Sequence, residues 1–257
     1  MAEFTSHETG SFCWLELATS DQAAAKIFYA TLFGWEAGDS PIGPDEVYTI
    51  FRLGGRDAAA GYTMRKDEAA MAPPHWNLYV TVESADATAE RAKELGGTVF
   101  CPPFDVMTHG RMVTIADPTG AVFCAWQPMT HIGVGVKDEA GAFCWADLST
   151  RDQPAAMGFY HQLMGWTFMP GEDNYQHIRN GEAFVGGIPP ASYLDPKLPP
   201  HWLVYFQVDD CAASTEKAKE LGAGLLAGPY LLDNVGHIAV LTDPQGAAFA
   251  LFQNLTT

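Results

Sequence analysis

The chain has 257 residues, of which 47% are hydrophobic and 18% are charged, so it carries enough apolar material for a sizeable folded core. Its formal net charge of −17 argues against a partner that needs a basic surface, such as nucleic acid or an anionic membrane. There is no apolar run of about 18 residues and no signal-peptide pattern in the first ten residues, MAEFTSHETG. Five cysteines, an odd number without a CxxC pair, are typical of a reduced chain. We therefore expect a cytoplasmic protein.

The first predicted element is an apolar, alternating strand over residues 12–19. A helix follows, with Asp21 in position to cap its first turn and Gly34 in position to end it. The aromatic residues at 28–29 fall on the apolar side of that helix, and we expect them in the core. Two further strands are predicted over 46–53 and 58–65.

The next part of the chain repeats this order. A strand over 76–82 precedes a helix over 84–97, which ends in two glycines. Two strands, 110–117 and 121–128, flank the turn Asp117-Pro118-Thr119-Gly120, where proline at the second position is pre-set for a turn. Each of these halves is one module of strand, helix and further strands.

The whole pattern then occurs a second time. Residues 10–35 recur at 141–166 with 15 of 26 positions identical, which is far above chance. The stretch 73–99 returns at 199–225, and 110–127 returns at 236–253. The sequence therefore predicts two domains, 8–130 and 139–255, joined by a glycine-rich and then charged linker over 131–140. The expected fold class is α+β, with curved mixed sheets and helices outside.

These repeated residues carry a family resemblance. The stretches ELATSDQAAAKIFYATLFGW, VESADATAERAKELGG and DPTGAVFCAWQ resemble the vicinal oxygen chelate superfamily, which includes glyoxalase I, bleomycin-resistance proteins and extradiol dioxygenases. Within it, the chain is most similar to the two-domain glyoxalase-like proteins of actinobacteria. The resemblance implies four βαβββ modules that form two tandem glyoxalase-like domains. In metal-using members it also implies a divalent ion that holds two substrate oxygens as a Lewis acid.

The positions that hold the metal in such relatives carry other residues here. The resemblance places them on the first strand of each module and on the last strand. In this sequence they are Trp14, Asn77 and Cys124 in the first unit, and Trp145, Leu203 and Ala250 in the second. Neither set suits zinc or a hard cation, so we predict no metal and no other cofactor.

One acid–histidine combination recurs near these positions. Glu16 and His75 of the first unit correspond to Asp147 and His201 of the second. A functional interpretation is a metal site or an acid–base dyad. The alternative, which we favour, is that each histidine is structural and hydrogen-bonds to the backbone at the start of its strand.

Other side chains are candidates for ligand contact, with core packing or solvation as the alternative for each. Trp14 and Trp145 suggest aromatic walls suited to a flat or apolar ligand. The complete set of predicted ligand-binding residues is Trp14, Glu16, His75, Asn77, Tyr79, His109, Arg111, Cys124, Trp145, Asp147, Tyr205 and His237. The catalytic residues are not predictable. The first unit keeps more polar groups at these positions, so we expect it to be the working one.

Three functions remain open from the sequence. The first is a metal-free small-molecule binding protein with an aromatic cleft. The second is a superfamily enzyme, a lyase, isomerase or oxygenase, acting on a small carbonyl or phenolic substrate. The third is a protein with vestigial clefts that acts through a surface partner. The expected assembly is a monomer with an internal pseudo-dimer, or a homodimer.

Overall fold

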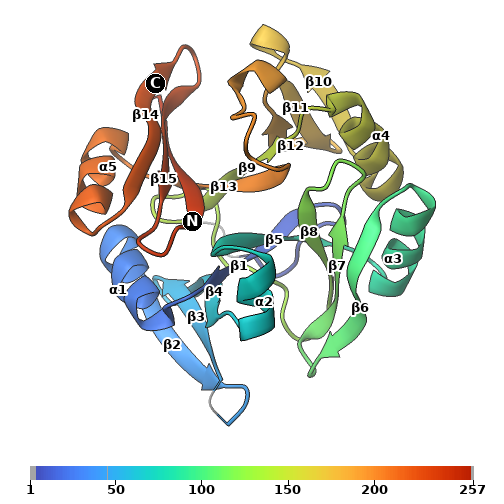
Figure 1. Ribbon diagram of the computed structural model, residues 1–257, viewed down its shortest axis with the longest axis horizontal. Helices are drawn as coiled ribbons and strands as arrows, with labels where there is room; N and C mark the ends of the chain where they lie inside the picture. Colours follow the sequence, from blue (N-terminus) through green and yellow to red (C-terminus); the bar gives the residue numbers. More distant parts are fainter. Residues whose placement is uncertain (1–3, 45, 256–257) are drawn as a thin grey trace.

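The computed structural model describes residues 4–44 and 46–255, and it folds them into two units of the same design (Figure 1). Each unit contains one eight-stranded mixed sheet. The strand order is β2-β3-β4-β1-β5-β8-β7-β6 in the first sheet and β10-β11-β12-β9-β13-β16-β15-β14 in the second. The two orders match strand for strand, and each unit is a pair of βαβββ modules. The predicted α+β fold and its tandem arrangement are confirmed.

The strands of the first unit are β1 (Phe12–Thr19), β2 (Glu36–Pro41), β3 (Val47–Leu53), β4 (Arg56–Thr63), β5 (His75–Thr81), β6 (Thr98–Val106), β7 (Gly110–Ala116) and β8 (Val122–Pro128). Its helices are α1 (Gln22–Phe33), α2 (Lys66–Met71) and α3 (Ala85–Glu94). The strands of the second unit are β9 (Phe143–Ser149), β10 (Thr167–Pro170), β11 (Gln176–Asn180), β12 (Ala183–Ile188), β13 (His201–Gln207), β14 (Gly224–Leu232), β15 (Gly236–Thr242) and β16 (Ala248–Asn254). Its helices are α4 (Gln153–Met164) and α5 (Cys211–Glu220), with short 3-10 turns at Glu172–Asn174 and Ala191–Tyr193.

Local sequence signals fix the ends of α1 as predicted. The Asp21 carboxylate accepts a hydrogen bond from the backbone N–H of Ala24 at 2.9 Å, which satisfies a free donor of the first turn. Gly34 ends the helix with φ of 75°, a left-handed conformation that glycine adopts without steric cost. The helix is thereby aligned on the sheet so that Phe28 and Tyr29 are buried in the core, again as predicted.

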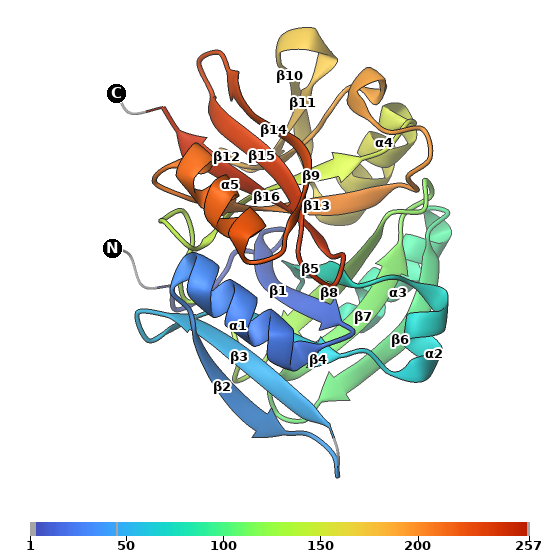
Figure 2. The ribbon, with the colours of Figure 1, turned by 60° about the vertical axis from the view of Figure 1, so that its left-hand side comes forward.

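The helices of the two units meet at the boundary between the units. α1 packs against α5, and α3 packs against α4 (Figures 1 and 2). Aromatic rings from both units interleave there: Phe12 lies edge-on to Trp166 with ring centroids 5.4 Å apart, and Phe206 lies against Trp35 at 5.6 Å. The two sheets therefore share one continuous apolar core.

Polar bonds cross the same boundary in equivalent pairs. The indole of Trp35 donates to the Gly141 carbonyl at 2.7 Å, and that of Trp166 donates to the Gly10 carbonyl at 2.8 Å. These pairs join the start of one unit to the helix end of the other. Because each bond has a counterpart, the chain resembles a dimer whose two subunits have been fused.

The main differences from the predicted elements are in the edge regions. Strands β2 and β6 were not expected, because β2 is polar and exposed and β6 contains two prolines, which are tolerated at a sheet edge. The short helix α2 was not expected either. No helix in residues 4–44 or 46–255 is long and apolar enough to cross a membrane. All five cysteines are free thiols.

Candidate functional site

A group of four neighbouring side chains lies on one face of the first sheet. Trp14 and Glu16 are two residues apart on β1 and so point to the same face. Tyr79 on β5 lies opposite Trp14, and its hydroxyl donates to the Glu16 carboxylate at 2.8 Å. Tyr48 on β3 adjoins Glu16, and its hydroxyl accepts from the Trp14 indole at 3.2 Å. We call these four residues the Glu16 group.

Glu16 is half-buried as a residue, whereas Trp14 and Tyr79 beside it are buried. Burial raises its pKa above the ordinary value, although the hydrogen bonds from Tyr48 and Tyr79 act in the opposite direction. Glu68 of α2 adds to the rise by charge repulsion. Glu68 in turn accepts a hydrogen bond from Tyr62 of β4, so a second carboxylate and a further phenol border the group.

The second unit repeats the arrangement residue for residue. The Asp147 carboxylate accepts from the Tyr175 hydroxyl at 2.6 Å and from the Tyr205 hydroxyl at 2.7 Å. The Trp145 indole donates to Asp147 at 3.0 Å and to the Tyr175 hydroxyl at 2.9 Å. We call these four residues the Asp147 group. Burial raises the pKa of Asp147, opposed by these three donors.

The phenol of Tyr175 lies directly over the backbone of β12. At Gly187, which pairs with Asp147, a Cβ atom would stand 1.7 Å from the Tyr175 hydroxyl oxygen. The residue that pairs with Glu16 in the first unit is Ala60, which has a Cβ. The phenol of the second unit therefore occupies space that a side chain fills in the first.

The predicted histidines do not join these groups by a hydrogen bond. The Nδ1 atom of His75 lies 2.8 Å from the Pro73 carbonyl, and that of His201 lies 2.9 Å from the Pro199 carbonyl. The favoured interpretation of these histidines as backbone-bonded is confirmed. No hydrogen bond between Glu16 and His75 occurs within the described part of the chain, so the structure does not form that predicted dyad.

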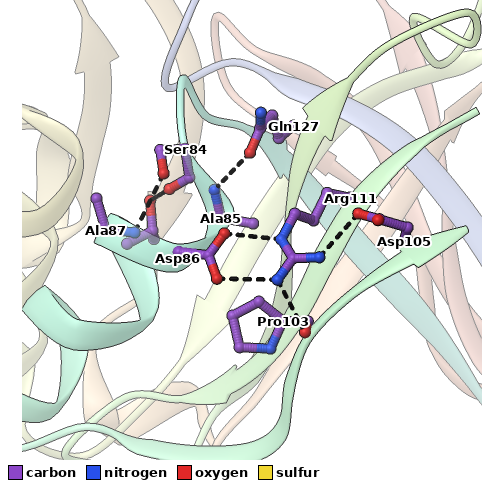
Figure 3. Close-up of polar contacts among 9 residues, drawn as sticks. Ser84, Ala85, Asp86, Ala87, Pro103, Asp105, Arg111 and Gln127 are labelled. Carbon is purple, nitrogen blue, oxygen red and sulfur yellow. Dashed lines mark hydrogen bonds and ion pairs between the residues drawn. The ribbon is translucent and has the colours of Figure 1, made fainter.

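Arg111 lies on the opposite face of the first sheet, under α3 (Figure 3). Its guanidinium makes two hydrogen bonds to Asp86 in the first turn of α3, at 2.7 and 2.9 Å, and one to Asp105 at 2.8 Å. It is thus separated from Glu16 by the sheet itself. His237 occupies the corresponding place in the second unit, opposite Gln253, and His109 is exposed near Thr130. These three predicted residues are not brought together with the Glu16 or Asp147 group.

The metal positions expected from the superfamily hold no metal-type donor set. Cys124 lies on the face of the Glu16 group, beside Thr114 at 3.6 Å, and burial raises the pKa of its thiol to about 12. Asn77 is paired with Glu16 across the strands, and Leu203 with Asp147. Within residues 4–44 and 46–255, no three His, Cys, Asp or Glu side chains are placed together to hold a metal ion. One carboxyl among phenols, an indole and a thiol does not fit the superfamily metal.

An open depression of about 340 Å³ lies elsewhere, at the start of α1. Its polar groups are already engaged: Lys26 forms an ion pair with Asp39 at 2.8 Å, and the Gln22 amide donates to Thr49 at 2.7 Å. We do not assign this depression a function.

Two members of these groups were not predicted as site residues. Tyr48 lies in β3 and Tyr175 directly precedes β11, in the stretches EVYTIFRL and DNYQHIRN, which differ at most other positions. The tyrosine itself recurs at the same place in both repeats, and that recurrence was the available signal. Trp14, Glu16, Tyr79, Trp145, Asp147 and Tyr205 were predicted, and the structure brings them together as described above.

Comparison with known proteins gives the family. The model of the glyoxalase-like domain family matches twice, over residues 14–126 and 145–252. A Mycobacterium tuberculosis protein provisionally named glyoxylase CFP32 is 39% identical over 260 residues, covering 98% of each chain. The anthracycline biosynthesis protein DnrV of Streptomyces peucetius is 32% identical over 263 residues, covering 95% of this chain and 93% of DnrV.

Solved structures show the same fold at low sequence identity. The Mn(II)-bound glyoxalase from Novosphingobium aromaticivorans superposes with a TM-score of 0.67 at 16% identity, over 96% of this chain and 83% of that one. The dioxygenase LapB from Pseudomonas sp. KL28 gives 0.66 at 13% identity, over 96% and 94%. The chain belongs to the glyoxalase-like domain family, whose model matches each of its two units in tandem.

Proposed function

We propose that this protein binds a small aromatic molecule against the Glu16 group of the first unit, without a metal. The observation that carries the proposal is a partly exposed glutamate surrounded by aromatic side chains. The partly exposed phenols of Tyr48 and Tyr62 supply aromatic surface for a ligand ring, beside the buried Trp14 and Tyr79, and the carboxyl supplies a directional polar contact. The donor set described above does not fit a metal, so ligand recognition is assigned to the side chains themselves.

The relatives supply a first choice of probe. Two of them, DnrV and DauV of Streptomyces, carry names that refer to anthracycline biosynthesis. A screen therefore includes an anthracycline beside simpler aromatic compounds such as naphthol. A ligand that binds only the folded state raises the unfolding free energy by about 2.7 kcal/mol at a hundredfold excess over Kd.

The test is thermal unfolding with each compound, for the wild type and for Trp14→Leu. We expect at least one aromatic compound to raise the Tm of the wild type and to have a smaller effect on Trp14→Leu. The matched control is Trp145→Leu, which removes the equivalent indole of the second unit. An equal rise in wild type and Trp14→Leu, or no rise with any compound, contradicts the proposal.

A second candidate is an enzyme that uses Glu16 to transfer a proton. The raised pKa of this carboxyl favours it, because a general acid or base works best with a pKa near the working pH. In this case Glu16 would give its proton to a carbonyl oxygen of the bound molecule. The test is turnover of a bound carbonyl or phenolic compound by wild type and Glu16→Gln. Turnover that is equal in both, or absent in the wild type, rejects this candidate.

A further inference from the structure

The carboxylates of the Glu16 group and the Asp147 group differ in how many of their acceptor positions are occupied by donors. Asp147 is 7% exposed and accepts three side-chain donors, two phenols and an indole, all within 3.0 Å. Glu16 is more exposed and accepts from the Tyr79 phenol, while the Trp14 indole donates to Tyr48 instead. A carboxylate offers about four lone-pair positions, so Glu16 keeps more unused acceptor capacity than Asp147.

The difference follows from one methylene group. On the same strand position, the longer glutamate carries its carboxyl further from the sheet than aspartate does. The Trp145 indole therefore reaches Asp147, and the equivalent Trp14 indole does not bond to Glu16. Gly187 also contributes to the packing of the Asp147 group, because its missing side chain lets the Tyr175 phenol lie against the backbone of β12.

The charges around Glu16 also restrict what can bind there. Glu68 is the second acid of this region and repels negative charge. The nearby arginines are held elsewhere: Arg65 pairs with Glu46 at 2.9 Å, and Arg111 lies on the other side of the sheet with Asp86. Among the described residues, the basic side chains beside the Glu16 group are two histidines, His75 and His131, the latter with its ring centroid 4.5 Å from that of Trp14.

We propose that the Glu16 group selects ligands that present a hydrogen-bond donor and carry no negative charge, and that the Asp147 group takes no such ligand. This inference rests on the proposed function of the first unit and adds the ligand class and the stoichiometry of one ligand per chain. The donor of the ligand bonds to the free acceptor positions of Glu16. Asp147 has three of its about four acceptor positions occupied and is only 7% exposed, so it offers a ligand no comparable access.

The test is titration calorimetry with three aromatic probes of one shape: naphthol, its methyl ether methoxynaphthalene, and naphthoate. Wild type is expected to bind one naphthol per chain, about tenfold or more tightly than methoxynaphthalene, and naphthoate more weakly still. Glu16→Gln and the charge-retaining Glu16→Asp are both expected to lose this preference for naphthol. Tyr205→Phe, in the second unit, is expected to keep it.

Each contrary outcome is distinct. Equal binding of naphthol and methoxynaphthalene overturns the inference but leaves the proposed aromatic site in place. Two naphthol molecules per chain, or a loss of the preference in Tyr205→Phe but not in Glu16→Gln, assigns the ligand to the second unit and also overturns it. Absence of binding by all three probes, with correctly folded protein by circular dichroism, contradicts the inference and the proposed function together.

Discussion

The buried contact between Tyr29 and Asp243 provides a quantitative test of the boundary between the units. The Tyr29 hydroxyl donates to the Asp243 carboxylate at 3.0 Å and accepts from the Trp76 indole at 3.2 Å. All three side chains are at most 6% exposed. In Tyr29→Phe the ring packing is kept, but a carboxylate oxygen and an indole N–H lose their partner.

A buried polar group without a partner costs about 1–3 kcal/mol, and more when it is charged. With two such groups, Tyr29→Phe is expected to lower the unfolding free energy by about 3 kcal/mol, or roughly a hundredfold in the folding equilibrium. The assay is urea unfolding followed by tryptophan fluorescence. The control is Tyr193→Phe, whose hydroxyl bonds to Asp173 at the surface and whose side chain is 66% exposed. There we expect a loss below about 0.5 kcal/mol.

Two results would refute this reasoning. If the unfolding free energy of Tyr29→Phe falls by less than about 1 kcal/mol, water or a rearranged side chain supplies the hydrogen bond to Asp243. Two separate unfolding transitions in the wild type would mean that the units do not share a core, since a common core predicts one cooperative transition.

Two further changes test the sites themselves. Because burial raises the pKa of Glu16, the folded protein holds this proton above the pH at which unfolded chains release it, and wild-type stability falls as pH rises from about 4.3 through the folded pKa. Glu16→Gln lacks this fall, so its stability relative to wild type is expected to improve as pH rises above about 4.3, measured by urea midpoints. A difference that stays constant with pH would count against a raised pKa. Gly187→Ala is expected to lower the unfolding free energy by about 1–3 kcal/mol, because the new methyl group overlaps the Tyr175 phenol. The control is Gly158→Ala in α4, where the added carbon meets no atom within 4 Å apart from its chain neighbours and the helix backbone around it; it is expected to raise the unfolding free energy by about 0.5–1 kcal/mol. Equal unfolding midpoints for these two variants would contradict the close packing of Tyr175 on Gly187.

Much of the frame is predictable from sequence because it depends on local signals. The apolar alternation of β1 and the Asp21 and Gly34 ends of α1 are each properties of a few adjacent residues. The same alternation places Trp14 and Glu16 on one face. Strands β2 and β6 were missed because an edge strand needs no apolar alternation and tolerates proline.

The site is less predictable because its contacts join distant strands. Tyr48 reaches Glu16 only through the pairing of β3, β4 and β1, which no local pattern specifies. The side to which Arg111 points depends on the register of β7, and one residue of shift exchanges the two faces of a strand. In the second unit an aspartate accepts from three donors, whereas in the first unit the equivalent glutamate is partly exposed. This difference depends on a single methylene group and on Gly187.

The most direct test of the account is a proton–nitrogen NMR spectrum of the tryptophan indoles during titration with naphthol. The Trp14 indole N–H reports on the Glu16 group and the Trp145 indole N–H on the Asp147 group, and each signal is assigned by its loss in Trp14→Phe or Trp145→Phe. We predict that naphthol shifts the Trp14 signal in a saturable manner and leaves the Trp145 signal in place. A saturable shift of Trp145 alone, or no shift of either signal, would contradict ligand binding at the first unit.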